Sequence, residues 1–266
     1  MTGIETNQCL GGVRCYLLDM DGTVYLEDHL LPGAIDFLAY LEKEGIDYLF
    51  LTNNSSKDPS QYLDKLNKLG IHTSRSRILT SGEATAIYLL KKLKNASLYV
   101  VGTPSLQEEF TSLGFVLTDQ DPDMIVLGFD TTLTYEKLWT CCNFVREGRP
   151  YIATHPDINC PTRDGYMPDI GSFIALIQAS TGREPDHIIG KPYEAMVEAI
   201  EFRTGYKRCE ICMIGDRLYT DIALGAFGIQ TILVLSGEAT KDDVLLAKTK
   251  PDYIMENLSE VLSTIR

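Results

Sequence analysis

The sequence predicts an α/β fold with a doubly wound, mostly parallel sheet and a second α/β domain inserted into the first. Three observations support this prediction. Short apolar runs of strand length alternate with segments of helical periodicity. The runs are apolar throughout, which is typical of strands buried on both faces. Several of them end at acidic or hydroxyl residues, as strands do at the ligand-binding edge of such a sheet.

The first half of the chain shows this alternation clearly. An apolar run at 13–18 predicts a buried strand. Apolar residues then repeat with helical spacing over 35–41, up to Gly45, a residue type that commonly ends helices. A second strand and a second helix follow at 48–51 and 62–70.

Further apolar runs predict strands along the rest of the chain. They are separated by helical or loop segments, without a low-complexity linker or a repeat of fixed period. A domain boundary must therefore be inferred from the distribution of functional residues. The predicted strands lie at 98–101, 124–127, 151–153, 211–214 and 232–235.

Composition restricts the partners of the protein. The chain has 266 residues, 44% of them hydrophobic, and a formal charge of −13. This charge disfavours a nucleic acid polymer or an anionic membrane and favours a small substrate. No apolar segment approaches the roughly 20 residues of a membrane span, and no leader-like segment precedes Gly12, so we expect a cytoplasmic protein. The seven cysteines do not resemble a secreted disulfide framework.

Two acidic residues, Asp19 and Asp21, follow the first predicted strand in the run Asp-Met-Asp-Gly-Thr. Adjacent, partly desolvated carboxylates repel each other unless a cation lies between them or one keeps its proton. Oxygen ligands favour Mg²⁺, which usually takes one or two carboxylates and keeps waters or phosphate oxygens in its other positions. The run therefore indicates a magnesium site, with a polar turn as the alternative.

This run resembles the first signature of the haloacid dehalogenase (HAD) superfamily. The resemblance implies that Asp19 is a nucleophile and that Asp21 is a general acid and base, whose main-chain carbonyl also binds the metal. An acid at the position of Asp21 marks phosphoryl transfer in that superfamily. Chemistry agrees, because an ester oxygen leaves more easily when it is protonated.

Two further stretches resemble the second and third signatures. The segment Leu-Thr-Asn-Asn at 51–54 implies that Thr52 and Asn53 bind phosphate and that Asn54 contacts the substrate. Lys191, between a glycine and a proline before a predicted helix, would bind phosphate and screen its charge from the nucleophile. Ordinary turn chemistry at Thr52 and a solvated lysine are the alternatives.

The fourth signature is matched by the stretch from Gly215 to Asp221. The resemblance implies that Asp216 binds the metal directly. Asp221 would join the metal site by a hydrogen bond to metal-bound water or to Lys191. A helix-capping role is the alternative for Asp221.

The four signatures occur in the expected order, two before residue 60 and two after residue 190. Together with Leu-Pro-Gly-Ala at 31–34, Gly-Phe-Asp at 128–130 and Val-Leu-Ser-Gly at 234–237, they resemble the NagD-type, or nitrophenylphosphatase-like, subfamily. This implies a Rossmann-like HAD core and a C2-type α/β cap. We place the core at 1–80 and 188–266 and the cap at 81–187.

The stretch Thr-His-Pro-Asp at 154–157 holds the strongest cap candidates for substrate contact. It follows a predicted strand, and we assign His155 and Asp157 to substrate binding. His155 stands where the subfamily usually has Asn, and Asp169 and Ile170 stand where it commonly has small residues. Loops without substrate contact are the alternative for both stretches.

The expected activity is Mg²⁺-dependent hydrolysis of a small phosphomonoester, such as a nucleotide or a sugar phosphate, through an aspartyl-phosphate on Asp19. A phosphotransferase or phosphomutase would use the same intermediate with another acceptor. An inactive phosphate-sensing module is the non-enzymatic alternative. No P-loop motif is present, which excludes that class of NTPase. An exposed cap face could support a homodimer.

Overall fold

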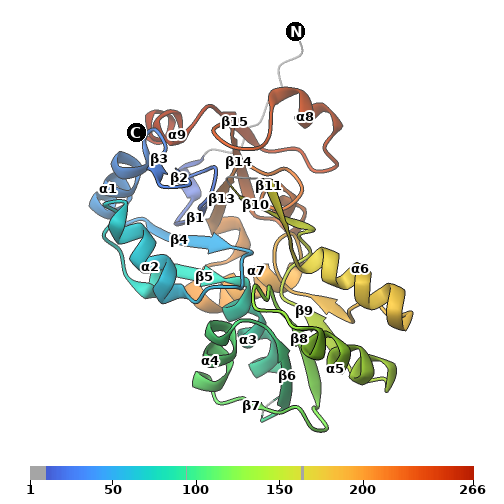
Figure 1. The fold of residues 1–266 in the computed structure, drawn as a ribbon. Helices are drawn as coiled ribbons and strands as arrows, with labels where there is room; N and C mark the ends of the chain where they lie inside the picture. The colour runs from blue at the N-terminus through green and yellow to red at the C-terminus, as the bar shows by residue number, and fades with distance from the viewer. Residues whose placement is uncertain (1–9, 94, 163–164) are drawn as a thin grey trace. The chain divides into compact units, whose positions relative to one another are not determined.

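The computed structural model describes residues 10–93, 95–162 and 165–266 (Figure 1). Helices and strands alternate along these residues. The helices are α1 (Ala34–Glu44), α2 (Pro59–Lys68), α3 (Ser81–Lys92), α4 (Pro104–Ser112), α5 (Tyr135–Arg146), α6 (Ile170–Thr181), α7 (Glu194–Thr204), α8 (Lys241–Leu246) and α9 (Leu258–Ile265), with 3-10 helices η1 (Leu10–Gly12), η2 (Arg75–Arg77), η3 (Arg208–Glu210) and η4 (Ile222–Phe227). The strands are β1 (Cys15–Asp19), β2 (Tyr25–Leu26), β3 (His29–Leu30), β4 (Asp47–Thr52), β5 (Ile78–Thr80), β6 (Ser97–Val101), β7 (Val116–Leu117), β8 (Met124–Leu127), β9 (Tyr151–Ala153), β10 (Asn159–Thr162), β11 (Gly165–Pro168), β12 (His187–Ile188), β13 (Ile211–Gly215), β14 (Gln230–Val234) and β15 (Tyr253–Met255).

The chain divides into two compact units. The core unit comprises the residues up to Leu51 together with Leu63–Ile78 and Ile200–Arg266, and the cap unit comprises Thr52–Tyr62 and Leu79–Ala199. The expected insertion at 81–187 lies inside the cap unit. That unit also includes the segment that follows β4, and the exact limits at 81 and 187 stay a prediction.

The core unit is built on a six-stranded sheet in the order β15-β14-β13-β1-β4-β5. Its central strands pair in parallel, with Leu18 opposite both Phe50 and Ile214. Consecutive residues of β1, β4, β13 and β14 are buried, so both faces of these strands are covered. The predicted doubly wound α/β class is confirmed.

The strand order reverses beside β1. The chain proceeds from β1 to β4 and β5 on one side, and it later returns through β13, β14 and β15 on the other. The carboxyl ends of β1 and β13 therefore flank a topological switch point, where open α/β sheets bind ligands. Asp19 ends β1 and Asp216 follows β13, so the sheet order alone brings two acidic residues to this edge.

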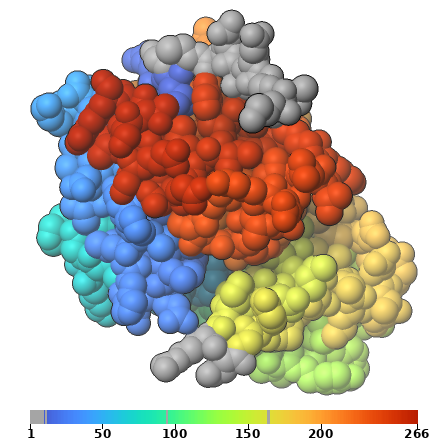
Figure 2. Space-filling model, turned by 90° about the horizontal axis from the view of Figure 1, so that it is seen from above, coloured from blue at the N-terminus to red at the C-terminus, as the bar shows by residue number. Residues whose placement is uncertain are grey.

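Helix α1 begins and ends at glycines. Gly33 and Gly45 both have positive φ, and the backbone N–H of Gly45 bonds to the last turn of the helix. The helix packs on α9, where Tyr40 Oη donates to the carbonyl of Ile265 at 3.2 Å. In Figure 2 the C-terminal segment, in red, accordingly lies against the blue N-terminal segment.

The cap unit has its own parallel sheet in the order β12-β9-β8-β6-β7. Its hydrophobic core is formed by β6, β8, β9 and β12 together with α5 and α6 and includes Phe129, Tyr151 and Ile177. A separate antiparallel hairpin pairs β10 with β11. A unit with its own core is what an inserted domain requires.

Two other expectations concern membrane-spanning segments and the cysteines. No helix among the described residues is long and apolar enough to cross a membrane. Every described cysteine is a free thiol, and Cys15, Cys141, Cys142 and Cys212 are buried. The expectation that no leader precedes Gly12 falls largely on residues 1–9, which lie outside the described part of the chain.

Candidate active site

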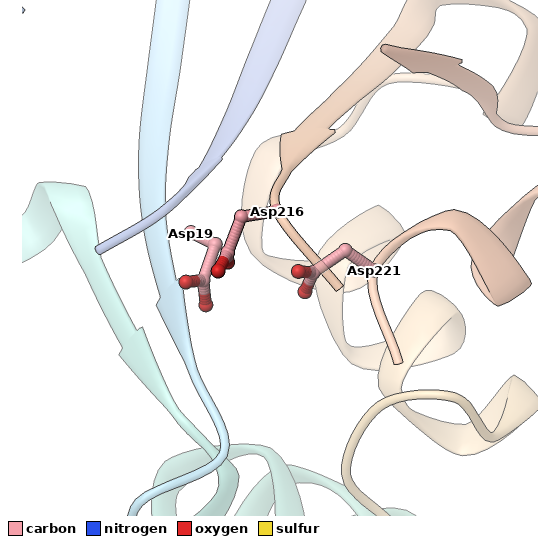
Figure 3. Close-up of side chains that lie close together, drawn as sticks. All are labelled: Asp19, Asp216 and Asp221. Atoms are coloured by element: carbon pink, nitrogen blue, oxygen red, sulfur yellow. The ribbon is translucent and has the colours of Figure 1, made fainter. Parts of the chain in front are cut away.

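Three carboxylates of the core unit converge at the switch point (Figure 3). Asp19 comes from the end of β1, Asp216 from the end of β13, and Asp221 from the residue that precedes η4. One oxygen from each lies within 4.8 Å of the others. We call these three residues the carboxylate cluster. The structure thus brings together three of the four acids that were predicted to form a metal site.

Glycines make this close approach possible. A Cβ at Gly22 would lie 2.3 Å from Asp216 Oδ2, and a Cβ at Gly237 would lie 2.0 Å from the same atom. A Cβ at Gly215 would lie 2.4 Å from Asp221 Oδ2. Any larger residue at these positions would push a cluster carboxylate out of place. Sequence reasoning did not assign these glycines, although each adjoins or lies within a quoted motif.

The carboxylate of Asp216 is in an unfavourable electrostatic environment. Burial, and then the charges of Asp19 and Asp221, raise its pKa to about 8. Its Oδ2 accepts a hydrogen bond from the backbone N–H of Glu238 at 2.8 Å. No hydrogen-bond donor among the described residues reaches its buried Oδ1.

This environment fits a bound divalent cation. Repelling carboxylates and a buried oxygen without a donor are both stabilised by a positive ion. All the cluster atoms are hard oxygen donors, which suit Mg²⁺ better than a softer metal. Asp19, Asp216 and Asp221 are therefore the residues that could hold a metal.

Arg217 supplies a permanent positive charge beside the cluster. Burial alone would lower its pKa, but the neighbouring carboxylates, Asp19 foremost, raise it. Its backbone N–H donates to Asp221 Oδ2 at 3.1 Å, and its Nε pairs with Glu238 at 3.0 Å. Asp221 therefore bonds to a backbone N–H instead of capping η4 with its side chain. Sequence reasoning quoted Arg217 but gave it no role.

Asp21 is not part of the carboxylate cluster. Much of the residue is exposed, yet the protein atoms around its carboxyl reduce its solvation and raise its pKa. The charges of Lys65 and Arg217 act in the opposite direction. Lys65 lies 3.9 Å from the centroid of the Tyr25 ring. A carboxyl that keeps its proton closer to neutral pH suits a general acid.

The cap unit gathers a second group of predicted residues around Asn53. The side-chain Oδ1 of Asn53 accepts from the Lys191 N–H at 2.8 Å, and its Nδ2 donates to the Lys191 carbonyl at 2.9 Å. The same Nδ2 lies 3.2 and 3.3 Å from the two oxygens of Asp157. Because the amide group is committed to these contacts, only the backbone of Asn53 is available for phosphate. We call these contacts the Asn53 clamp.

Asp157 is half-buried, and burial raises its pKa. The neighbouring charges of His155 and Lys191 lower this pKa in part, while Asp169 raises it further. Lys191 is buried, as its glycine and proline flanks suggested. Asn53, Asp157 and Lys191, which were predicted from distant parts of the sequence, thus lie together.

The other two residues of the 52–54 segment make local contacts. Thr52 Oγ1 accepts from the backbone N–H of Asn54 at 3.2 Å. The side-chain Oδ1 of Asn54 accepts from both the N–H and the hydroxyl of Ser56, at 2.9 and 2.7 Å. The segment is therefore an ordered turn. The phosphate and substrate contacts of Thr52 and Asn54 stay predictions.

His155 occupies a different environment from the one expected. We predicted a substrate contact, but the residue is fully buried and both ring nitrogens have partners. Nε2 lies 3.0 Å from Asp169 Oδ1, and Nδ1 lies 3.2 Å from Thr154 Oγ1. A direct substrate contact would require the ring to leave these partners, and the contact predicted for His155 stays a prediction. Asp169 is also buried and caps α6, in contrast to an exposed loop residue.

Comparison with known proteins agrees with this architecture. Residues 16–116 match the family model described as haloacid dehalogenase-like hydrolase, and residues 188–261 match the model described as HAD-hydrolase-like. An acid sugar phosphatase from Staphylococcus aureus is 36% identical over 95% of this chain and 98% of its own length. A 4-nitrophenylphosphatase from Thermotoga maritima is 45% identical, covers 97% of this chain and 99% of its own, and has a TM-score of 0.93. NagD from Escherichia coli K-12 is 30% identical, with coverages of 93% and 98% and a TM-score of 0.87.

The fold, the carboxylate cluster and these relatives define the class of protein. The chain belongs to the haloacid dehalogenase-like hydrolases and, within them, to the NagD-like phosphatases. It is accordingly an enzyme of the phosphoric monoester hydrolase class. The family and enzyme class predicted from the motifs are confirmed.

Proposed function

We propose that this phosphatase hydrolyses a small phosphomonoester with Mg²⁺ and an aspartyl-phosphate intermediate on Asp19. The observation that carries the proposal is the carboxylate cluster, in which the buried Asp216 presents an oxygen without a hydrogen-bond donor among the described residues. Asp19, Asp216 and Asp221, with the main-chain carbonyl of Asp21, would hold the metal. A bound Mg²⁺ would neutralise their charge and polarise the substrate phosphate.

The reaction proceeds in two displacements at phosphorus. In the first, a carboxylate oxygen of Asp19 forms a bond to phosphorus and the ester P–O bond breaks, while Asp21 gives its proton to the leaving oxygen. In the second, Asp21 accepts a proton from water, whose oxygen attacks phosphorus and breaks the bond to Asp19. Inorganic phosphate and free Asp19 are the products. The raised pKa of Asp21 supports its role as the acid in the first displacement.

The cap unit would bind the rest of the substrate. Thr52 and the backbone at Asn53 and Asn54 are assigned to the phosphate, and Lys191 to its negative charge. Asp157 is assigned to a polar group of the leaving portion. The Asn53 clamp supports this division, because it holds Lys191 and Asp157 at a fixed distance from each other.

A sugar phosphate is our preferred substrate class. The relative from Staphylococcus aureus bears the name acid sugar phosphatase and aligns along nearly all of this chain. The half-buried carboxylate of Asp157 is also suited to accept hydrogen bonds from hydroxyl groups.

Phosphate release from sugar phosphates and from 4-nitrophenyl phosphate tests the proposal. We expect release in Mg²⁺, near-complete loss in excess chelator, and recovery when Mg²⁺ is restored. Asp216→Ala should be inactive at all Mg²⁺ concentrations, whereas Glu108→Ala, on the exposed surface of α4, should resemble the wild type. Full activity in chelator together with an active Asp216→Ala variant would refute the metal assignment.

A further inference from the structure

The cap unit contains a buried chain of hydrogen bonds that no step of the proposed reaction uses. The backbone N–H of Phe129 donates to Ser55 Oγ at 2.9 Å, and Ser55 Oγ lies 2.9 Å from Thr154 Oγ1. Thr154 Oγ1 lies 3.2 Å from His155 Nδ1, and His155 Nε2 lies 3.0 Å from Asp169 Oδ1. These four bonds connect the segments that follow β8, β9 and β4 with the residue that caps α6.

The two ends of this chain have fixed roles. The Phe129 N–H can only donate and the Asp169 carboxylate can only accept. The Ser55 and Thr154 hydroxyls and the His155 ring lie between them, and each can take part in both of its bonds. Hydrogen bonds that are connected in this way strengthen one another.

This chain supports both sides of the Asn53 clamp. Ser55 fixes the segment that carries Asn53, and the Ser81 hydroxyl donates to the Asn53 carbonyl. On the other side, the carbonyl of Thr154 accepts from the Gly190 N–H at 2.8 Å, next to Lys191. Asn53 therefore holds the backbone of Lys191 directly, and Thr154 holds that of the preceding Gly190.

The backbone of Gly190 is tightly packed against Asn53, Thr154 and His155. A Cβ at Gly190 would lie 2.7 Å from Asn53 Oδ1, from His155 Cβ and from the Thr154 carbonyl oxygen. A shift of His155 would therefore displace the backbone at 190 and 191 and disturb the Asn53 clamp. Interiors packed this tightly transmit small displacements.

We propose that His155 and Asp169 are positioning residues that hold Lys191 and Asp157 in the geometry needed to bind the substrate phosphate and leaving group. This inference rests on the proposed function, which assigns Lys191 to phosphate. Neither His155 nor Asp169 touches the substrate. Their effect on the position of Lys191 passes through Thr154. The hydroxyl of Thr154 bonds to His155, and its carbonyl accepts from the Gly190 N–H.

A simpler role for Asp169 is to cap α6, since its Oδ1 also accepts from the Ile170 N–H at 2.7 Å. Two substitutions separate the roles. Asp169→Asn keeps an acceptor for both Ile170 and His155. Asp169→Ser keeps a residue type that caps helices well but is too short to reach His155.

We expect Asp169→Ser to raise the KM for 4-nitrophenyl phosphate and the inhibition constant for inorganic phosphate by about 10-fold or more, because the variant loses a hydrogen bond to a charged group in a buried network. Asp169→Asn should stay within about 3-fold of the wild type. Mg²⁺ affinity, measured by calorimetry without substrate, should be unchanged in both variants, because the carboxylate cluster belongs to the core unit.

Two further variants make the test robust. Thr154→Val breaks the same chain from the other side and should reproduce the phosphate defect, even if Asp169→Ser does not fold. Asp130→Asn is a matched control, since Asp130 is equally buried in the cap unit but bonds to Lys137 at 2.7 Å. It should leave phosphate affinity unchanged.

Three results would overturn the positioning role. The first is wild-type phosphate affinity in a folded Asp169→Ser or Thr154→Val variant. The second is a loss of phosphate affinity in Asp169→Asn that equals the loss in Asp169→Ser. The third is a loss of Mg²⁺ affinity that accompanies the loss of phosphate affinity. If the wild type releases no phosphate, the proposed function fails instead. Calorimetric binding of inorganic phosphate then still decides whether the variants weaken this site.

Discussion

At the scale of single residues, the site depends on charges that the fold holds in an unfavourable arrangement. The carboxylate cluster places three acids within 4.8 Å, and Asp216 keeps its proton to about pH 8 as a result. Such an arrangement destabilises a protein unless a cation or a proton compensates it. The residues at the ends of β1 and β13 are thus selected for ligand binding at the expense of stability.

Asp216 makes the stability of the metal-free protein depend on pH. Its pKa is near 3.8 when unfolded and about 8 when folded, so between these values the folded state binds more protons. Stability from this group is present in full below pH 4 and is lost as the pH rises to 8. In excess chelator, we expect the free energy of unfolding of the wild type, relative to that of Asp216→Asn, to fall from pH 5 to pH 8 by on the order of a few kcal/mol at most, as measured by denaturant unfolding at each pH. Adding Mg²⁺ at pH 8 should reverse the shift in the wild type alone. A difference that does not change with pH would contradict the raised pKa.

The variants Asp19→Asn and Asp21→Asn should be blocked at different steps of the reaction. Asp19→Asn removes the nucleophile and should block phosphoenzyme formation. Asp21→Asn cannot protonate a poor leaving group, but nitrophenolate leaves without help, so the first displacement should survive and the second should stall. Rapid mixing with 4-nitrophenyl phosphate should then release about one coloured equivalent per site before slowing markedly. Mass spectrometry should place the trapped phosphate on Asp19, and phosphate on another residue would exclude this mechanism.

The members of the carboxylate cluster could be predicted as candidate metal ligands from the sequence, because acids at strand ends are visible in a pattern of apolar runs. The environment of His155 could not be predicted from the sequence. Its ring contacts Asp169, 14 residues away, and Ser81, which is far from it in the chain. Nothing in the local pattern around His155 indicates that its ring will contact a buried acid.

At the scale of elements, strand ends and glycines place the functional side chains. The strands predicted at 124–127 and 151–153 match β8 and β9 residue for residue, because each is a continuous buried apolar run. The β10-β11 hairpin was missed, since its residues are mostly exposed and do not alternate. Strands β7 and β12 were missed because two residues carry no periodicity.

Gly215 provides a test of how a strand end shapes the metal site. It lies in β13 without a positive φ, so alanine fits its backbone, but the new Cβ would lie 2.4 Å from the Asp221 carboxylate. We expect Gly215→Ala to displace Asp221 and weaken Mg²⁺ binding by about 10-fold or more, measured by calorimetry. Gly12→Ala is the control, because no atom lies within 4 Å of its added Cβ. Unchanged Mg²⁺ affinity in a folded Gly215→Ala variant would mean that Asp221 does not contribute to the site.

At the scale of the whole molecule, the two units carry different parts of the predicted machinery. The carboxylate cluster and Asp21 lie in the core unit, whereas Thr52, Lys191 and Asp157 lie in the cap unit. The sequence predicted an insertion, because two signatures precede it and two follow it. It did not predict that residues 52–62 belong to the cap unit. That grouping depends on bonds from Asn53 and Ser55 to residues about a hundred positions away, and no local pattern encodes them.

This division predicts that the cap unit chooses the substrate while the core unit performs the chemistry. Asp157→Ala should therefore lower kcat/KM selectively, with the largest losses for substrates whose hydroxyl groups bond to the carboxylate, such as sugar phosphates. A substrate that lacks such groups, 4-nitrophenyl phosphate, should lose less, since only the effect on the Asn53 clamp remains. Each lost hydrogen bond to a charged group corresponds to roughly 10-fold or more in kcat/KM. Kinetics across a panel of phosphomonoesters measures this, with Glu108→Ala, an exposed acid of α4, as the control. A uniform loss that leaves the ranking of substrates unchanged would show that Asp157 supports the site without selecting the leaving group.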